Sequence, residues 1–278
     1  MEETETPVSQ LLHNGELLNS NRPVIAINDG AILRGQGIFE TLAVYHGEPF
    51  ALHPHYLRLN KGAERLDLIP PAFEEFKSQS QKIISANRLE NAPKARLRVT
   101  LTAGSGITNT TFTTSTDLSH SETATVITLP FARNEKGALT GIKTINYGEN
   151  VVAARFARKA GTDDALFGNS QGQLCEGIWS NVFVQIDGQW ITPPLESGCL
   201  PGVTRETILD FSGAGFPVIK QSTIELSDLI SVEAAFLTSS IREIQPITAI
   251  DGREIDTLLR AEISQWQQAY REQTSQKE

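Results

Sequence analysis

A lysine in the middle of the chain is the first residue whose type and position could do chemistry. Lys143 ends a β-type run in the stretch GIKTINYGENVV and precedes a segment with small residues at helical spacing. A lysine amine attacks a carbonyl only when it is neutral, which requires partial desolvation or a neighbouring cation. Lys143 is therefore either a Schiff-base nucleophile or an ordinary exposed lysine at a strand end.

A carboxylate follows in the stretch LCEGIWSNVFVQIDG, where two strand-like segments flank Glu176, Ser180 and Asn181. Glu176 could hold the protonated ring nitrogen of a pyridine cofactor, and this pairing strengthens such a cofactor as an electron sink. It could equally be a structural partner of a backbone amide. The motif alone leaves both interpretations open.

Two segments rich in small residues could bind a phosphate group. Val203 and Thr204 begin a predicted helix, whose unpaired N–H groups and positive dipole end attract anions, although Thr204 could also be a plain N-cap. Thr238, Ser239 and Ser240 cluster at the end of a predicted strand, where they form either a phosphate clamp or a turn. Each segment is a weak signal when taken alone.

Arg58 is a third candidate for phosphate binding, because a guanidinium can donate two hydrogen bonds to one anion. Its alternative is an ion pair on the surface of a helix. A reactive lysine, an acid for a ring nitrogen and several anion-binding groups are together what pyridoxal phosphate requires. The combined set therefore predicts an enzyme that uses this cofactor.

The composition is that of an ordinary globular protein. Of 278 residues, 39% are hydrophobic and 21% are charged, which suits one large domain or two medium ones. The net charge of −9 and the lack of a lysine-rich run argue against nucleic-acid binding. No apolar run approaches the length of a membrane span, no signal-peptide pattern is present, and two cysteines cannot build a disulfide framework. We therefore expect a cytoplasmic protein.

We also expect no metal site, because His53 and His55 lack a cysteine or carboxylate set at ligand spacing. The hydrophobic pattern indicates an amphipathic helix over residues 70–87. We expect residues 1–20 to be a loose arm and residues 105–122 to be a long polar loop. Predicted strands cover residues 24–29, 37–45, 95–104 and 123–131.

The order of these elements predicts a mixed α+β fold with two lobes, each built mainly around a sheet. Helices and strands do not alternate regularly, which argues against a Rossmann or TIM-barrel architecture. A polar connection at residues 132–137 is interpreted as an interdomain linker. We expect an N-terminal lobe over residues 1–131 and a C-terminal lobe over residues 138–278 that carries the lysine and the phosphate-binding groups.

Five ordered stretches of the sequence resemble the class IV aminotransferase family, the fold-type IV pyridoxal phosphate enzymes. They are RGQGIFETLAVYHGEPFALHPHYLRL, GIKTINYGENV, CEGIWSNVF, TPPLESGCLPGVTR and LTSSIREIQPI. The resemblance runs from about residue 24 to residue 255. It implies two lobes with pyridoxal phosphate between them, a homodimer that shapes the site, and a small amine or amino acid as the substrate.

The resemblance also implies a role for each candidate residue. Lys143 would form the Schiff base and move protons, and Glu176 would pair with the pyridine nitrogen. The other implied cofactor contacts are Arg58, Ser180, Asn181, Val203, Thr204, Ser239 and Ser240. The implied substrate-side residues are Phe39, Arg96, Arg98 and Tyr147.

Three activities of the family fit the sequence to different degrees. D-amino-acid transaminases carry a tyrosine and an arginine that hold the substrate carboxylate, whereas this chain has Phe39 and Ala103 at those positions. Branched-chain aminotransferases usually have FEG where this chain has FET, and Asn146 comes one residue earlier than in their lysine motif. Both departures weigh against the transaminases.

The short bacterial 4-amino-4-deoxychorismate lyases are most similar in GIFET, in ARLRVTLTAG and in TSSIREIQPIT. Arg96 and Arg98 would face a dicarboxylate substrate together if no bulge interrupts their strand, or they would form salt bridges at the solvent face. We therefore expect a lyase of folate-precursor synthesis that gives 4-aminobenzoate and pyruvate. An amino-acid transaminase of the branched-chain or D-amino-acid type is the alternative, because both reactions share their first half.

Overall fold

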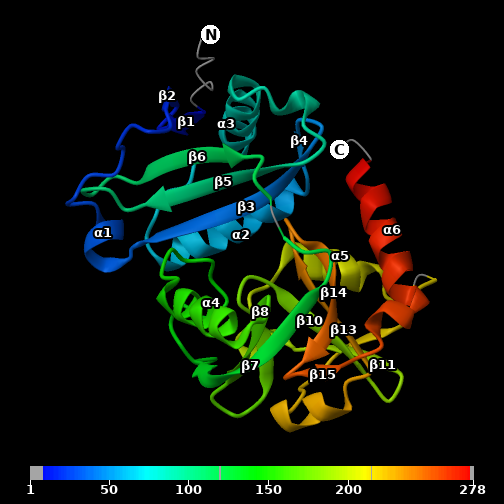
Figure 1. Cartoon of the computed structure of the whole chain (residues 1–278). Coiled ribbons are helices and arrows are strands. Elements are labelled where there is room, and N and C mark those ends of the chain that lie inside the picture. Colours follow the sequence, from blue (N-terminus) through cyan, green and yellow to red (C-terminus); the bar gives the residue numbers. More distant parts are fainter. Residues whose placement is uncertain (1–8, 119, 214, 276–278) are drawn as a thin grey trace, which may run out of the picture. The chain divides into compact units, whose positions relative to one another are not determined.

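The computed structural model of the chain describes residues 9–118, 120–213 and 215–275. These residues form two compact units, each with its own sheet (Figure 1). Unit 1 contains the described residues up to Leu118 together with Lys143–Asn146. Unit 2 contains residues 120–142 and the described residues from Tyr147 onward. The predicted mixed α+β fold is confirmed.

Unit 1 is a six-stranded antiparallel sheet in the order β2-β1-β6-β5-β3-β4. Its strands are β1 Gln10–His13, β2 Glu16–Asn19, β3 Gly37–Tyr45, β4 Glu48–Pro49, β5 Ala95–Thr102 and β6 Asn109–Ser115. Its helices are α1 Gly30–Arg34, α2 Leu52–Arg65, α3 Phe73–Ala86 and the short 3-10 helix η1 Leu89–Asn91. The expected strands over 37–45 and 95–104 and the expected helix over 70–87 are confirmed.

Strand alternation divides the side chains of β3 and β5 between two faces of this sheet. On the core face, Glu40 pairs in register with Val99, and Val99 with Phe112 of β6. Helix α3 covers this face through Phe76, whose ring centroid lies 5.8 Å from that of Phe112. Helix α2 packs beside α3 through Tyr56, 5.3 Å from Phe76 between ring centroids. Residues with the opposite parity in β3 and β5 therefore point to the other face.

Two expectations for the N-terminal part were wrong. Residues 10–19 form the hairpin of β1 and β2 and not a loose arm, because Leu12 is fully buried and pairs with Phe112. Residues 1–8 of that expected arm lie outside the described part. Residues 24–29 are not a strand, since Ile27 is exposed and the buried Asp29 accepts hydrogen bonds from the Ala31 amide and the Thr102 hydroxyl. Asp29 is thus the N-cap of α1.

The expected polar loop at 105–122 was also wrong over residues 109–115. This stretch is β6, which pairs along its whole length with β5. Threonine dominates it, and β-branched side chains favour the extended backbone. The Thr-rich composition was therefore a strand signal that polarity alone concealed.

Unit 2 is a nine-stranded mixed sheet with the order β12-β11-β10-β13-β14-β7-β8-β9, and β15 pairs with β14. Its strands are β7 Ala124–Arg133, β8 Asp164–Asn169, β9 Leu174–Gly177, β10 Asn181–Ile186, β11 Gln189–Thr192, β12 Ile219–Gln221, β13 Ala234–Ser239, β14 Glu243–Ile250 and β15 Arg253–Glu254. Its helices are α4 Gly148–Ala160, η2 Leu195–Ser197, α5 Val203–Phe211, η3 Leu226–Ser231, η4 Thr257–Leu259 and α6 Ala261–Ser275.

The core of unit 2 lies on both sides of the central strands β10 and β13. On one face the Phe183 and Phe236 rings stack at 4.7 Å, and Trp266 of α6 packs 5.4 Å from Phe236. On the other face Val182 and Leu237 belong to an aliphatic cluster. Asn181 at the start of β10 pairs in register with Thr238 near the end of β13, so the polar ends of these two strands lie side by side.

The two units differ from the predicted lobes in two places. Strand β7 takes its hydrogen bonds from β8 and β14, although the prediction placed most of it in the N-terminal lobe. The segment Lys143–Asn146 groups with unit 1, although the prediction placed it in the C-terminal lobe. The expectation that residues 1–131 and 138–278 are separate lobes stays a prediction. In the described part of the chain, every helix is too short or too polar to cross a membrane.

Candidate active site

The backbone around Lys143 is fixed to the start of β3. The Phe39 amide donates to the Lys143 carbonyl at 2.9 Å, and the Ile145 amide donates to the Gly37 carbonyl at 3.0 Å. A Cβ atom at Gly37 would lie 2.9 Å from the Leu101 carbonyl oxygen as well as 2.8 Å from the Ile145 side chain, so a glycine is required here. Lys143 therefore lies in a short extended segment with a single bridge at Thr144, and not at the end of a strand.

Lys143 shares an aromatic ring with a second cation. Its Nζ atom lies 4.6 Å from the centroid of the Phe39 ring, and the Arg98 guanidinium lies 3.6 Å from the same centroid. Cations are attracted to the face of an aromatic ring. The ring thus places a permanent positive charge close to a half-buried lysine, which is the environment that a nucleophilic amine requires.

Arg96 lies on the same face of β5 as Arg98. The pairing of β5 with β3 and β6 is regular through both residues, so no bulge separates them. Arg98 is half-buried and donates from Nε to the Thr100 hydroxyl at 3.3 Å, whereas Arg96 is exposed. Arg98 therefore lies over the Phe39 ring near Lys143, whereas Arg96, on the same face of the strand, is exposed to solvent.

Arg58 belongs to a buried charged cluster with two residues that the sequence analysis did not assign. Its Nε and Nη2 atoms donate to the two carboxylate oxygens of Glu40 at 2.8 and 2.7 Å. His55 donates from Nδ1 to Glu40 Oε2 at 2.7 Å. Arg58 and His55 are three residues apart on α2, which places them on the same face of the helix. The hydrogen bonds to Glu40 fix the orientation of the Arg58 guanidinium.

The charges in this cluster are set by its burial and its pairing. Burial alone would raise the pKa of Glu40, but the Arg58 charge and the hydrogen bonds from Arg58 and His55 outweigh it and hold that pKa well below its usual range. Burial lowers the pKa of His55, and the contact with Glu40 only partly opposes this. At neutral pH the cluster therefore combines an ionised Glu40, a charged Arg58 and a neutral His55.

In unit 2, Glu176 is held through both of its oxygens. Oε2 accepts a hydrogen bond from the Leu200 amide at 2.8 Å, and Oε1 pairs with Arg133 Nη2 at 3.2 Å. The Arg133 guanidinium in turn lies 4.1 Å from the centroid of the Phe167 ring, next to Glu176 on the neighbouring strand. The carboxylate is thus fixed in direction, and it is ready to accept a hydrogen bond from a protonated ring nitrogen.

The start of α5 is fixed to the same strands. Asn181 donates from Nδ2 to the Leu200 carbonyl at 2.8 Å, and a Cβ atom at Gly202 would lie 1.9 Å from Asn181 Oδ1. Gly202 is the N-cap and provides no side-chain cap, so the first amides of the nine-residue helix, from Val203 and Thr204, keep their anion-binding character. The buried Thr204 hydroxyl lies 3.4 Å from the hydroxyl of Tyr270 on α6.

Two buried hydroxyls near this helix start have no hydrogen-bond partner among the described residues: Ser180 Oγ and Thr238 Oγ1. Asn181, the neighbour of Ser180, pairs in register with Thr238, so the two hydroxyls border the same end of the sheet. Buried polar groups are nearly always satisfied, and an unsatisfied one points to a ligand. Together with the uncapped helix and the fixed Glu176, these hydroxyls fit a phosphorylated pyridine such as pyridoxal phosphate.

The remaining predicted residues lie at the margins of this group. The Ser239 hydroxyl accepts from the Arg242 amide at 3.1 Å, and Ser240 follows it, half-buried, in the turn between β13 and β14. Tyr147 precedes α4, and its ring lies 5.3 Å from that of Trp179. Unit 2 therefore brings together Glu176, Ser180, Asn181, Val203, Thr204 and Ser239, and unit 1 brings together Lys143, Phe39 and Arg98.

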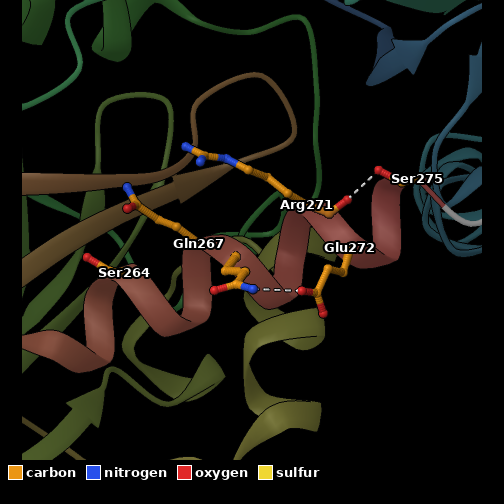
Figure 2. A pocket seen from close by; sticks show the side chains of 6 residues that line it. Ser264, Gln267, Arg271, Glu272 and Ser275 are labelled. Carbon is orange, nitrogen blue, oxygen red and sulfur yellow. Dashed lines mark hydrogen bonds between the residues drawn. The ribbon is translucent and has the colours of Figure 1, made fainter.

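A shallow surface depression on α6 does not belong to these groups (Figure 2). All its lining residues come from that one helix, and they pair with each other: Gln268 Nε2 donates to Glu272 Oε1 at 2.9 Å, and the Ser275 hydroxyl donates to the Arg271 carbonyl at 2.8 Å. The lining side chains are polar, and Gln267 donates away from the depression to the Ile244 carbonyl at 3.0 Å. We assign no chemistry to it.

The pattern of the family Amino-transferase class IV matches residues 37–250 of the chain. The chain is 28% identical over 251 residues to the aminodeoxychorismate lyase of Bacillus subtilis, covering 86% of this chain and 85% of the relative. It is 26% identical over 256 residues to the D-alanine aminotransferase of Bacillus licheniformis, covering 88% of this chain and 90% of the relative.

A solved structure supports the same family. The fold IV-transaminase CpuTA1 of Curtobacterium pusillum superimposes with a TM-score of 0.84 at 29% sequence identity, and the match covers 96% of this chain and 99% of that structure. The family pattern covers far more than half of the chain. The chain belongs to the class IV aminotransferases and is a two-lobed fold-type IV enzyme that depends on pyridoxal phosphate, as a transaminase or a lyase.

Proposed function

We propose that this enzyme is a 4-amino-4-deoxychorismate lyase, which releases 4-aminobenzoate and pyruvate. The observation that carries the proposal is the Phe39 ring with Lys143 Nζ 4.6 Å and the Arg98 guanidinium 3.6 Å from its centroid. The lyase substrate carries carboxylates, so a fixed guanidinium beside the reactive lysine suits it. Similarity to the Bacillus subtilis lyase supports the same reaction.

The family resemblance implies which residues would hold the cofactor. Glu176 would accept the hydrogen bond of the ring nitrogen, with Ser180 and Asn181 beside the ring. When bound, pyridoxal phosphate supplies an electron sink that stabilises negative charge on the substrate. The groups proposed to hold its phosphate are Arg58, the amides of Val203 and Thr204 with the Thr204 hydroxyl, Ser239 and Ser240.

Lys143 would then act as the proton carrier of the reaction. Its Nζ atom would take the proton from the ring carbon that bears the amino group, and the C–O bond to the enolpyruvyl group would break as the ring becomes aromatic. The departing enolpyruvate would take up a proton and become pyruvate. Glu176 keeps its direction through the step because Arg133 and the Leu200 amide hold both of its oxygens. Arg98 orients the substrate through a carboxylate, and Phe39 keeps Arg98 and Lys143 in one geometry.

The roles of Arg96 and Tyr147 are more peripheral in this proposal. Arg96 shares a face of β5 with Arg98 and would attract a dicarboxylate toward that face. Tyr147, whose ring contacts Trp179, would border the substrate from unit 2. Neither residue takes a proton in the proposed reaction.

An amino-acid transaminase is the second candidate, and its support is the 29% identity to a fold IV-transaminase. In that reaction Lys143 would return the proton to the cofactor. The two reactions share the removal of the first proton, so they differ only in the product. A branched-chain or D-amino-acid substrate would fit this alternative.

We also propose a homodimer. Helix α1 and the segment before it expose three large apolar side chains, Ile27, Ile32 and Leu33, with exposed fractions of 81%, 56% and 59%, and exposed apolar side chains are frequent at subunit interfaces. A second copy of the chain is the occupant that the family resemblance implies. The cytoplasmic location stays a prediction.

A product assay tests the proposed reaction. Aminodeoxychorismate is generated in the assay, and 4-aminobenzoate and pyruvate are followed together on purified protein with pyridoxal phosphate. Equal, catalytic release of both products is expected. Absence of both, with conversion of the cofactor to its pyridoxamine form on addition of amino acids, would contradict the lyase and favour the transaminase.

A further inference from the structure

Two turns carry most of the proposed cofactor contacts of unit 2. The glutamate turn, residues 176–181, contains Glu176, Ser180 and Asn181. The hydroxyl turn, residues 239–242, contains Ser239 and Ser240. Asn181 pairs with Thr238 in the sheet, so the two turns emerge at the same end of neighbouring strands.

One buried carboxylate contacts both turns. Asp164, the first residue of β8, is fully buried. Its Oδ1 atom accepts from the Ile178 amide of the glutamate turn at 3.0 Å, and its Oδ2 atom forms an ion pair with Arg242 of the hydroxyl turn. Oδ1 also accepts from the Ala165 amide at 2.7 Å, which fixes the direction of the carboxylate. Asp164 thus connects the turns through its two oxygens.

Arg242 is held on the other side as well. Its Nη1 atom donates to Gln245 Oε1 at 3.2 Å, and Gln245 donates from Nε2 to the Ser121 carbonyl at 2.6 Å. Its own amide donates to the Ser239 hydroxyl at 3.1 Å, closing the hydroxyl turn. The Arg242 side chain is 16% exposed, so water screens this pair weakly.

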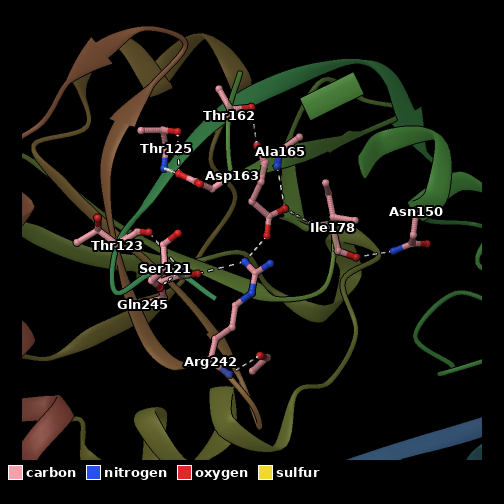
Figure 3. Close-up of polar contacts among 12 residues, drawn as sticks. Ser121, Thr123, Thr125, Asn150, Thr162, Asp163, Ala165, Ile178, Arg242 and Gln245 are labelled. Carbon is pink, nitrogen blue, oxygen red and sulfur yellow. Dashed lines mark hydrogen bonds and ion pairs between the residues drawn. The ribbon is translucent and has the colours of Figure 1, made fainter. Parts of the chain in front are cut away.

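The glutamate turn is fixed at the same residue from the opposite direction. The Ile178 carbonyl accepts a hydrogen bond from Asn150 of α4 (Figure 3). Asn150 Oδ1 accepts in turn from Arg133, the arginine that pairs with Glu176, at 3.4 Å. A continuous set of polar contacts therefore runs from the hydroxyl turn through Asp164 to Glu176.

We propose that Arg242 is a positioning residue that, through Asp164, holds the hydroxyl turn and the glutamate turn in the mutual geometry that binds pyridoxal phosphate. Arg242 itself touches neither the cofactor nor the substrate. The inference rests on the proposed cofactor contacts of the two turns. It does not depend on whether the reaction is a lyase or a transaminase reaction.

The test compares cofactor affinity with folding stability in three variants. Arg242→Met removes the charge that pairs with Asp164, and Arg242→Lys keeps the charge but loses the planar guanidinium. The double variant Asp164→Asn with Arg242→Met removes both charges, so no carboxylate stays buried without a partner. The side-chain carbonyl that Asp164→Asn introduces would still offer an oxygen to the Ile178 amide. The dissociation constant of pyridoxal phosphate is measured by titrating the apo protein, and the melting temperature is measured without cofactor.

In Arg242→Met the dissociation constant should rise about tenfold, the effect of one misplaced hydrogen bond to a charged group, and the melting temperature should fall. Arg242→Lys should recover part of the affinity. The double variant should recover the melting temperature while its dissociation constant stays raised. Arg260→Met is the matched control, because Arg260 forms an ion pair with Glu233 at 3.1 Å in the same unit, and it should leave the affinity unchanged.

Two results would overturn the inference. One is an unchanged dissociation constant in Arg242→Met despite a lower melting temperature. The other is full recovery of affinity together with the melting temperature in the double variant, since the residue would then act only on folding. Failure of the lyase proposal would appear separately, as wild-type protein that binds pyridoxal phosphate but releases no 4-aminobenzoate.

Discussion

In unit 1 the cluster that contains Arg58 is charged and already paired, whereas in unit 2 most candidate groups are hydroxyls and backbone amides at turns and at a helix start, with Glu176 as a charged and paired exception. The buried Glu40 is bound by Arg58 and His55 at 2.7 to 2.8 Å. By contrast, the buried hydroxyls of Ser180 and Thr238 have no partner among the described residues. The Glu40 cluster is therefore hydrogen-bonded without a ligand, whereas the two hydroxyls need one.

This difference separates two kinds of contribution to the site. A complete charged cluster fixes the direction of its arginine at the cost of burying charge, so its loss should destabilise the fold. A buried hydroxyl without a partner lowers the stability of the apo protein. This cost is offset only when a bound ligand provides an oxygen for the hydrogen bond. Substitutions in the paired cluster of Glu40, Arg58 and His55 should therefore act mainly on folding, and substitution of an unpaired hydroxyl in unit 2 should act mainly on cofactor affinity.

The largest effect is expected for Lys143→Ala. Loss of the proposed nucleophile and proton carrier should lower the turnover rate on the order of 10³-fold or more. Lys94→Ala is the matched control, because Lys94 Nζ also lies over an aromatic ring, 5.5 Å from the centroid of Tyr45. The steady-state rates of both variants are measured. Comparable activity in the two would contradict the proposed role of Lys143.

Glu40→Gln should be the most destabilising of the substitutions in the buried cluster. It leaves the Arg58 charge without its carboxylate, and breaking a buried pair in this way costs about 3 kcal/mol of unfolding free energy. Urea unfolding of the apo protein measures the change. Glu75→Gln on the exposed face of α3, where Glu75 accepts from Gln79, should stay within about 0.5 kcal/mol of wild type.

Thr238→Val tests the opposite behaviour in unit 2. Removal of a buried hydroxyl without a partner should leave the apo protein as stable as wild type or up to about 1 kcal/mol more stable. The affinity for pyridoxal phosphate should fall about tenfold if this hydroxyl meets the cofactor. Calorimetry on apo protein and a cofactor titration give the two numbers.

Thr192→Val provides the comparison, since the Thr192 hydroxyl is equally buried but donates to the Val182 carbonyl at 2.8 Å. This variant should lose about 1 kcal/mol of stability and keep its cofactor affinity. Equal stability losses in Thr238→Val and Thr192→Val would contradict the claim that the Thr238 hydroxyl lacks a partner in the apo protein.

The smallest expected effect is a pH dependence that originates at His55. Its pKa is lowered in the folded state by burial, so the unfolded chain binds the proton first as the pH falls. Stability should therefore decrease by about 0.7 kcal/mol between pH 7 and pH 6, with the ordinary pKa of 6.5 applying to the unfolded chain. The depressed pKa of Glu40 adds a loss only below about pH 5, where the unfolded carboxyl takes up its proton.

His55→Asn should remove the step between pH 7 and pH 6, and the exposed His53→Asn should retain it. Urea unfolding at three pH values measures both variants. A stability that rises on acidification in wild type would mean that His55 is charged in the folded cluster.

The sequence predicted the central strands and the identity of the candidate residues better than their surroundings. Alternation and β-propensity located β3 and β5, and with them the shared face of Arg96 and Arg98. A carboxylate within the apolar run GIFETLAV, followed by His55 and Arg58 at helical spacing, was a usable signal for the buried cluster. Taken one at a time, however, none of these three residues indicates that they meet.

Other features depend on contacts that are remote in sequence. Nothing near Asp164 indicates that its carboxylate meets both Ile178 and Arg242, because the three lie on different strands and turns. The same holds for Gly202, which is glycine because Asn181 approaches it across the sheet. Local pattern reveals which residues can do chemistry, and only the fold reveals which residues hold them.

The measurement that tests the central claim most directly is reductive trapping of the cofactor on the wild-type protein. Holoenzyme is treated with borohydride, digested, and its peptides are sequenced by mass spectrometry. A single pyridoxyl group on the peptide that contains Lys143, absent in Lys143→Ala, is the expected result. A pyridoxyl group on a different lysine, or none in a protein that retains pyridoxal phosphate, would contradict the assignment of Lys143 and the site built around it.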